Sequence, residues 1–91
     1  MARHNLTDNT PTLIQDNTGA DYLAPQVVGS SDVLFLRTTT NTAPTDWSGA
    51  YRVPCPRVGQ NNEPFPISGL TGYYLWAIPV SGPSTIVDGD A

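Results

Sequence analysis

The most apolar stretch of the chain covers residues 73–80, Tyr-Tyr-Leu-Trp-Ala-Ile-Pro-Val. Aromatic and β-branched residues of this kind are typical of a β-strand, and turn residues flank the stretch on both sides. Because side chains alternate along a strand, the stretch has two faces, one with Tyr73, Leu75 and Ala77 and the other with Tyr74, Trp76, Ile78 and Val80. Both faces are apolar. The strand therefore belongs inside a sandwich, or has one face covered by another protein.

The remaining pattern predicts more short strands. Residues 84–87 follow Ser81-Gly82-Pro83, and we expect them to return as the second arm of a β-hairpin. Runs bounded by turn residues predict further strands near residues 26–28, 33–39, 50–54 and 64–67. Nine prolines leave few windows long enough for a helix. The sequence thus predicts an all-β fold, either a small β-sandwich or a jelly-roll-like barrel.

The first 24 residues differ from the rest because they are polar and carry few apolar side chains. Such a segment has little reason to order by itself. We therefore expect an extended N-terminal arm over residues 1–24 and a β-sandwich body over residues 25–91. Leu6, Leu13 and Ile14 are the residues by which this arm would contact a partner.

The composition is unusual in its low charge. The 91 residues include no lysine, four arginines and eight acids, and charged residues make up 13% of the chain. This share is about half that of an ordinary soluble domain, which carries charge to stay dispersed. The chain is also small, so its core is modest. Together these features indicate a protein that works inside an assembly, with homo-oligomers expected.

The net charge and the distribution of apolar residues argue against several classes of function. Binding to nucleic acid requires clustered Lys and Arg, whereas the net charge here is −4. No apolar run approaches the roughly 20 residues that span a membrane, and the N-terminus has no apolar signal core, so we expect neither membrane insertion nor secretion by that route. The single Cys55 fits synthesis in a reducing cytoplasm.

Candidate chemistry is sparse. His4 is the only histidine and lies in the polar arm, and Cys55 stands between two prolines. Asp88 and Asp90 lack the further oxygen ligands at fixed spacing that a calcium loop requires. We therefore expect no enzyme activity, no metal and no cofactor.

A role in a protein interface explains the remaining conspicuous side chains better than a catalytic role does. Trp47 lies in a loop, and Trp and Arg are common anchors of protein interfaces. We expect Trp47, Arg37, Arg52 and Arg57 to contribute to partner binding. The alternative for Trp47 is a contact with carbohydrate.

Several short motifs resemble small virion proteins of tailed bacteriophages. They are Asp32-Val-Leu-Phe-Leu-Arg37, Ala43-Pro-Thr45, Gly49-Ala-Tyr51, Pro66-Ile-Ser-Gly-Leu70, Tyr74-Leu-Trp-Ala77, Ser81-Gly82 and Thr85-Ile-Val87. The resemblance covers roughly residues 30–88, leaves out the arm and carries no catalytic residue. It implies a small β-sandwich or jelly-roll-like module.

The function implied by this resemblance is structural. The chain would bind and stabilise the capsid surface as a decoration or cement protein, with the major capsid protein or other virion proteins as partners. Its place would be the virion, after synthesis in the host cytoplasm. The alternative is a component of the neck, tail or fibre, or a module of the tail that binds a carbohydrate or a receptor.

Overall fold

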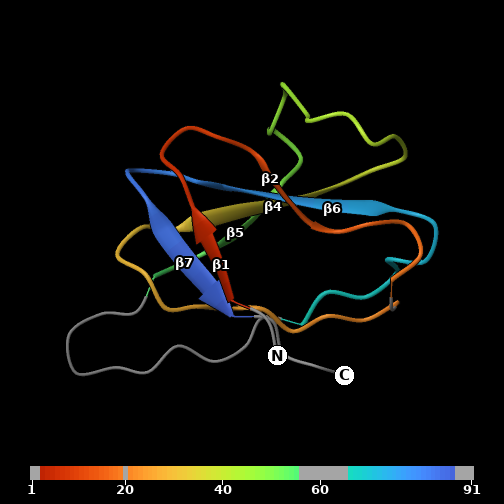
Figure 1. The fold of residues 1–91 in the computed structure, drawn as a ribbon, viewed down its shortest axis with the longest axis horizontal. Helices are drawn as coiled ribbons and strands as arrows, with labels where there is room; N and C mark the ends of the chain where they lie inside the picture. The colour runs from red at the N-terminus through yellow and green to blue at the C-terminus, as the bar shows by residue number, and fades with distance from the viewer. Residues whose placement is uncertain (1–2, 20, 56–65, 88–91) are drawn as a thin grey trace.

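In the computed structural model, short β-strands build the described part of the chain (Figure 1). The structure describes residues 3–19, 21–55 and 66–87. The strands are β1 (Arg3–Leu6), β2 (Thr12–Gln15), β3 (Gln26–Val27), β4 (Val33–Thr38), β5 (Tyr51–Val53), β6 (Tyr74–Pro79) and β7 (Ser84–Val87). The predicted all-β fold is confirmed.

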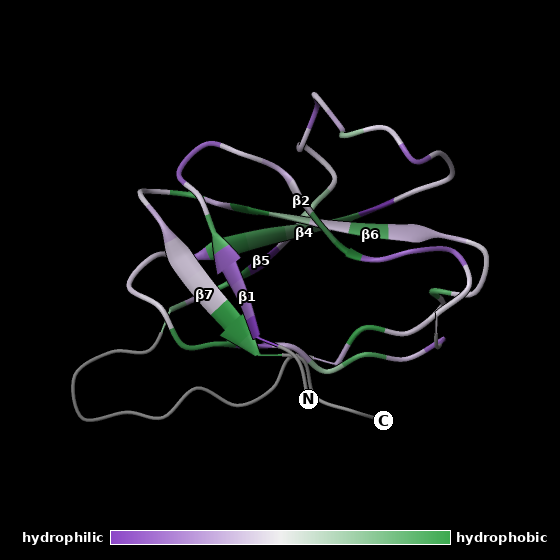
Figure 2. Cartoon of the chain, viewed as in Figure 1, coloured by the Kyte–Doolittle hydropathy of each residue, from purple (hydrophilic) through white to green (hydrophobic). Residues whose placement is uncertain are grey.

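The strands form two antiparallel sheets, ordered β1-β7-β3 and β2-β6-β4-β5. In Figure 1, β1 and β7 lie on one side of β4 and β6. Apolar side chains from both sheets form one core cluster, to which β4 contributes Val33 and Phe35, and β7 contributes Ile86. All three side chains are fully buried. The hydropathy colouring in Figure 2 shows β4 as strongly apolar and β1 as mostly polar.

Most of the strands lie where the sequence predicts them. Residues 26–28, 33–39, 50–54, 73–80 and 84–87 contain β3, β4, β5, β6 and β7. The strand predicted over residues 64–67 begins outside the described residues. Within the described part, Ile67 forms an isolated antiparallel bridge with Leu23.

The predicted hairpin between β6 and β7 is wrong, because the two strands belong to different sheets. β2 and β4 flank β6 on both sides, which leaves no edge for β7. Two hydrogen bonds also tie the intervening turn to the residues before β4. The N–H of Val80 donates to the carbonyl of Asp32 at 2.8 Å, and the N–H of Ser81 donates to Ser31 Oγ at 2.9 Å. The chain therefore crosses from one sheet to the other at residues 80–83.

Within the segment expected as an extended arm, residues 1–24, the described residues supply a strand to each sheet. β1 pairs with β7 from Arg3 opposite Val87 to Leu6 opposite Ser84, and β2 pairs with β6. A polar segment can do this because strand pairing satisfies backbone N–H and C=O groups whatever the side chains are.

Candidate interaction surface

The four-stranded sheet has a second apolar face, turned away from the core. Val33 and Phe35 of β4 and Leu75 of β6 belong to the core cluster, so the alternate residues of these strands point to the opposite side. Residues paired across strands share a side of the sheet. We call this surface the outer face, and the described pairing assigns to it Leu13, Leu34, Leu36, Thr38, Tyr74, Trp76 and Ile78.

Cross-strand pairs organise the outer face. The pairs between β4 and β6 are Leu34 with Ile78, Leu36 with Trp76, and Thr38 with Tyr74. Leu13 of β2 lies opposite Trp76 on the other side of β6. Apart from Trp76, all these residues are half-buried. Their neighbours therefore shield them only in part, and the face is an apolar surface in contact with water.

Trp76 lies between β2 and β4 on the outer face. It is 9% exposed, although it stands apart from the core cluster. Its indole Nε1–H donates to Thr38 Oγ1 at 3.1 Å, which gives the ring a fixed direction across the sheet. The prediction that Trp76 and Leu75 point to opposite faces agrees with this arrangement.

The charge at the rim of the outer face is paired. Arg52 lies on β5 opposite Leu34, and its Nε–H and Nη2–H donate to Asp32 Oδ2 at 3.1 and 2.9 Å. The backbone N–H of Cys55 donates to the other carboxylate oxygen at 2.8 Å. The bond from Cys55 and then those from Arg52 lower the pKa of Asp32 below its usual value. The carboxylate thus neutralises the one charged residue that the register places beside the face.

Arg37 lies on the opposite side of the sheet and binds within the molecule. Its Nη1–H donates to the carbonyl of Gly69 at 3.0 Å, and its guanidinium carbon is 5.1 Å from the centre of the Tyr73 ring. The second contact has the distance of a cation–π interaction. Gly69 has a φ of 72°, and a Cβ there would approach Arg37 Nη1 to 2.9 Å. Arg37 therefore holds the segment before β6 against the end of β4.

The other residues expected to bind a partner are dispersed. Leu6 and Ile14 pack into the chain's own core, at 2% and 9% exposed, whereas Leu13 lies on the outer face. Trp47 is half-buried in the loop between β4 and β5. Arg57 lies outside the described residues. The structure thus brings Leu13, together with Arg52 at the rim, to the candidate surface.

The alternation along residues 73–80 already placed Ile78 beside Trp76, whereas Leu34 and Leu36 were not predicted to belong to this surface. The sequence did contain evidence for them, in the unbroken apolar run at residues 33–36. A strand covered on one face alone would alternate with polar residues, so this run predicts that both faces of β4 are covered.

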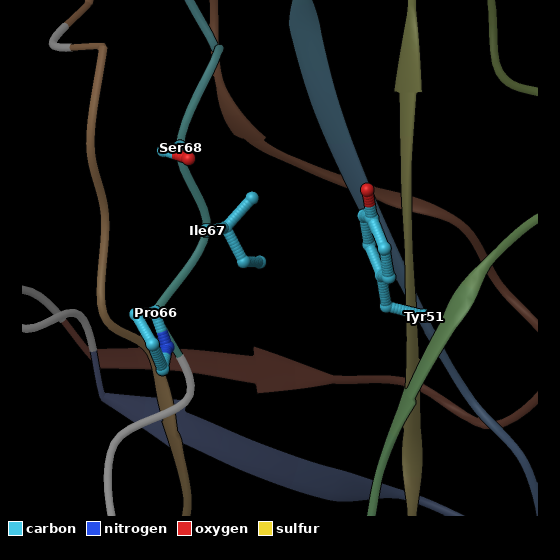
Figure 3. Close-up of a pocket in the computed structure, with 4 residues that line it drawn as sticks. All are labelled: Tyr51, Pro66, Ile67 and Ser68. Atoms are coloured by element: carbon cyan, nitrogen blue, oxygen red, sulfur yellow. The ribbon is translucent and has the colours of Figure 1, made fainter.

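A small hollow lies beside β5, lined by Tyr51, Pro66, Ile67 and Ser68 (Figure 3). Its volume of about 140 Å³ suits a single side chain better than a substrate, because pockets for small ligands usually exceed about 300 Å³. Figure 3 shows Ile67 directed toward the Tyr51 ring. The lining offers hydroxyl groups but no base or carboxylate.

Two further findings concern the described residues. They contain no group of three His, Cys, Asp or Glu side chains arranged to hold a metal ion. They also contain no helix long and apolar enough to cross a membrane.

Comparison with known proteins gives no relative: no family model, no curated protein and no solved structure matches the chain.

Proposed function

We propose that this chain is a structural protein of a bacteriophage virion, a decoration or cement protein that binds and stabilises the capsid surface. The observation that carries the proposal is the outer face, an apolar sheet surface on a chain with very little charge. Two of the motifs that resemble phage virion proteins, at residues 32–37 and 74–77, contribute to β4 and β6, the central strands of this sheet. The resemblance and the surface thus involve the same residues.

In this function the chain works by adhesion. Each Å² of apolar surface removed from water contributes about 25 cal/mol, and the loss of rotational and translational freedom opposes it. The major capsid protein or other virion proteins are the partners, together with further copies of this chain. The proposal assigns no reaction, metal or cofactor to the protein.

The direct test is to look for the chain in particles. Virions of the phage that encodes it would be purified and separated into capsids and tails, and the chain quantified against the major capsid protein by mass spectrometry. We expect it in the capsid fraction, in many copies per particle. Recovery in the tail fraction would support a neck, tail or fibre component instead. If the chain is abundant in the lysate and absent from particles, the proposal is wrong.

A further inference from the structure

Arg52 is the one charged residue that the described register places on the outer face, opposite Leu34. The charge at its rim, on Arg52, is paired with Asp32. Charged groups of a partner would lose their water on this face without gaining an unpaired opposite charge. Burying them there would therefore cost free energy. The surface that covers the outer face must itself be uncharged and apolar.

A second copy of the chain presents such a surface. Asp32 lies beside the outer face, where it is paired with Arg52 of the same chain. Two copies can therefore stack these faces with this charge already neutralised within each copy, despite a net charge of −4 each.

The available area indicates a weak contact. With strands about 4.8 Å apart and about 3.4 Å per residue, β2, β6, β4 and β5, of four, six, six and three residues, cover about 300 Å². A standard stable interface buries about 800 Å² on each partner, so the sheet alone supplies less than half. A dimer built on this face belongs among the weak and reversible complexes unless other residues add to it.

The loop at residues 39–50 can add area and also restricts the partner's shape. In Figure 1 this loop, drawn in yellow-green, rises on the side of β4 and β6 opposite to β1 and β7. It would hold a broad flat surface away from one end of the outer face. A second copy related by a twofold axis can instead place its own loop beside the other end, where Trp47 would extend the contact.

We propose that the outer face is the contact between two copies of this chain, stacked sheet on sheet about 10 Å apart around a twofold axis. The inference rests on the proposed function, in which protein contact is the chain's whole activity, and it names the first of those contacts. The outer face then serves the proposed function by joining copies of the chain, and each pair would bind the particle through the low-charge surface that remains outside the dimer.

Sedimentation equilibrium of the isolated full-length chain tests this, over concentrations from micromolar to millimolar. We expect a reversible monomer–dimer equilibrium that Leu36→Lys weakens at least tenfold, because the new charge would lie opposite Trp76 at the centre of the contact. The matched control is Val28→Lys, which changes an aliphatic residue, 40% exposed, next to β3 in the other sheet. The control should dimerise like the wild type.

A second measurement uses the wild-type chain alone, so its result does not depend on whether the Leu36→Lys variant folds. Dilution of the wild-type chain, followed by amide NMR, should shift resonances of β4 and β6 and leave those of β1 unchanged. A wild-type chain that is monomeric up to millimolar concentration would overturn the inference, as would dilution shifts confined to β1, β3 and β7. Dimerisation of a chain that is absent from particles would contradict the proposed function alone. A chain found on capsids and monomeric in solution would contradict this inference alone.

Discussion

At the scale of single residues, Trp76 is the side chain on which the outer face depends most. It is the most buried member of the face, and its indole N–H is bonded to Thr38. Its burial comes from neighbours on the outer face, since it is not part of the core cluster. The stability of the chain should therefore depend on this face as well as on the core.

Trp76→Ala should lower the free energy of unfolding by about 3–5 kcal/mol, the range found for removal of a large buried aromatic side chain. Urea unfolding followed by circular dichroism measures this loss. The matched control is Trp47→Ala, which should cost less because Trp47 is half-buried in a loop. A loss for Trp76→Ala within about 0.5 kcal/mol of zero would be typical of a surface residue and would contradict the assigned packing.

Asp32 should make stability fall in acid. Hydrogen bonds from the Cys55 backbone and from Arg52 hold the pKa of Asp32 below its ordinary value of 3.8 in the folded chain. The unfolded chain lacks these bonds and therefore binds the proton at higher pH. Stability is then fully present above about pH 5 and is lost as the pH falls through the folded-state pKa.

Urea unfolding at several pH values checks this, with Asp32→Asn expected to reduce the fall below about pH 4. Asp46→Asn is the control, because the bond that lowers the pKa of Asp46 comes from Ser48 in its own turn, where the unfolded chain can also form it. An acid-induced fall that is the same in Asp32→Asn and the wild type would show that these bonds do not stabilise the fold.

At the scale of elements, the sequence predicts strands well where their own side chains determine them. β4, β6 and β7 are apolar or β-branched, and their residue ranges are close to the predicted ones. β1 was missed because its residues are mostly polar and its partner, β7, lies about 80 residues away. The hairpin was wrong because the choice of sheet depended on edges that β2 and β4 already occupied.

The candidate surface was likewise predictable only where the side chains of a single strand determine it. Alternation along residues 73–80 places Trp76 on a face that needs cover, and this can be deduced from the sequence. That Leu34 and Leu36 extend the same surface depends on the register between β4 and β6, which no local pattern specifies. Nor does the sequence indicate that Arg37 binds Gly69 and Tyr73, residues more than 30 positions away.

The N-terminal strands give a prediction at this scale. Deleting residues 1–15 removes β1 and β2, one strand from each sheet, together with the buried side chains of Leu6 and Ile14. We expect the shortened chain to lose its cooperative unfolding transition. Leu6→Ala in the full chain should cost about 2–5 kcal/mol, whereas Thr7→Ala, at an exposed neighbour, should change little. A shortened chain with an unchanged transition would mean that the segment is an independent arm after all.

At the scale of the whole molecule, low charge and an apolar sheet surface point to the same mode of association. Of the four arginines, Arg52 is paired with an acid of its own chain and Arg37 binds a carbonyl and an aromatic ring. Lysine is absent. Electrostatic attraction between this chain and an anionic partner therefore has few groups on which to act, and against such a surface burial of apolar and backbone groups must supply most of the affinity.

Washing purified particles tests this central claim most directly. At about 1 M NaCl the Debye length falls to about 3 Å, so contacts between exposed charges are screened, whereas apolar burial is not weakened. Urea weakens the burial of both apolar and peptide groups. The chain remaining on each batch of particles would be quantified by gel after either wash. We predict that it stays bound through 1 M NaCl and is released by urea; its release by salt alone would show that charge carries the contact and would contradict the account.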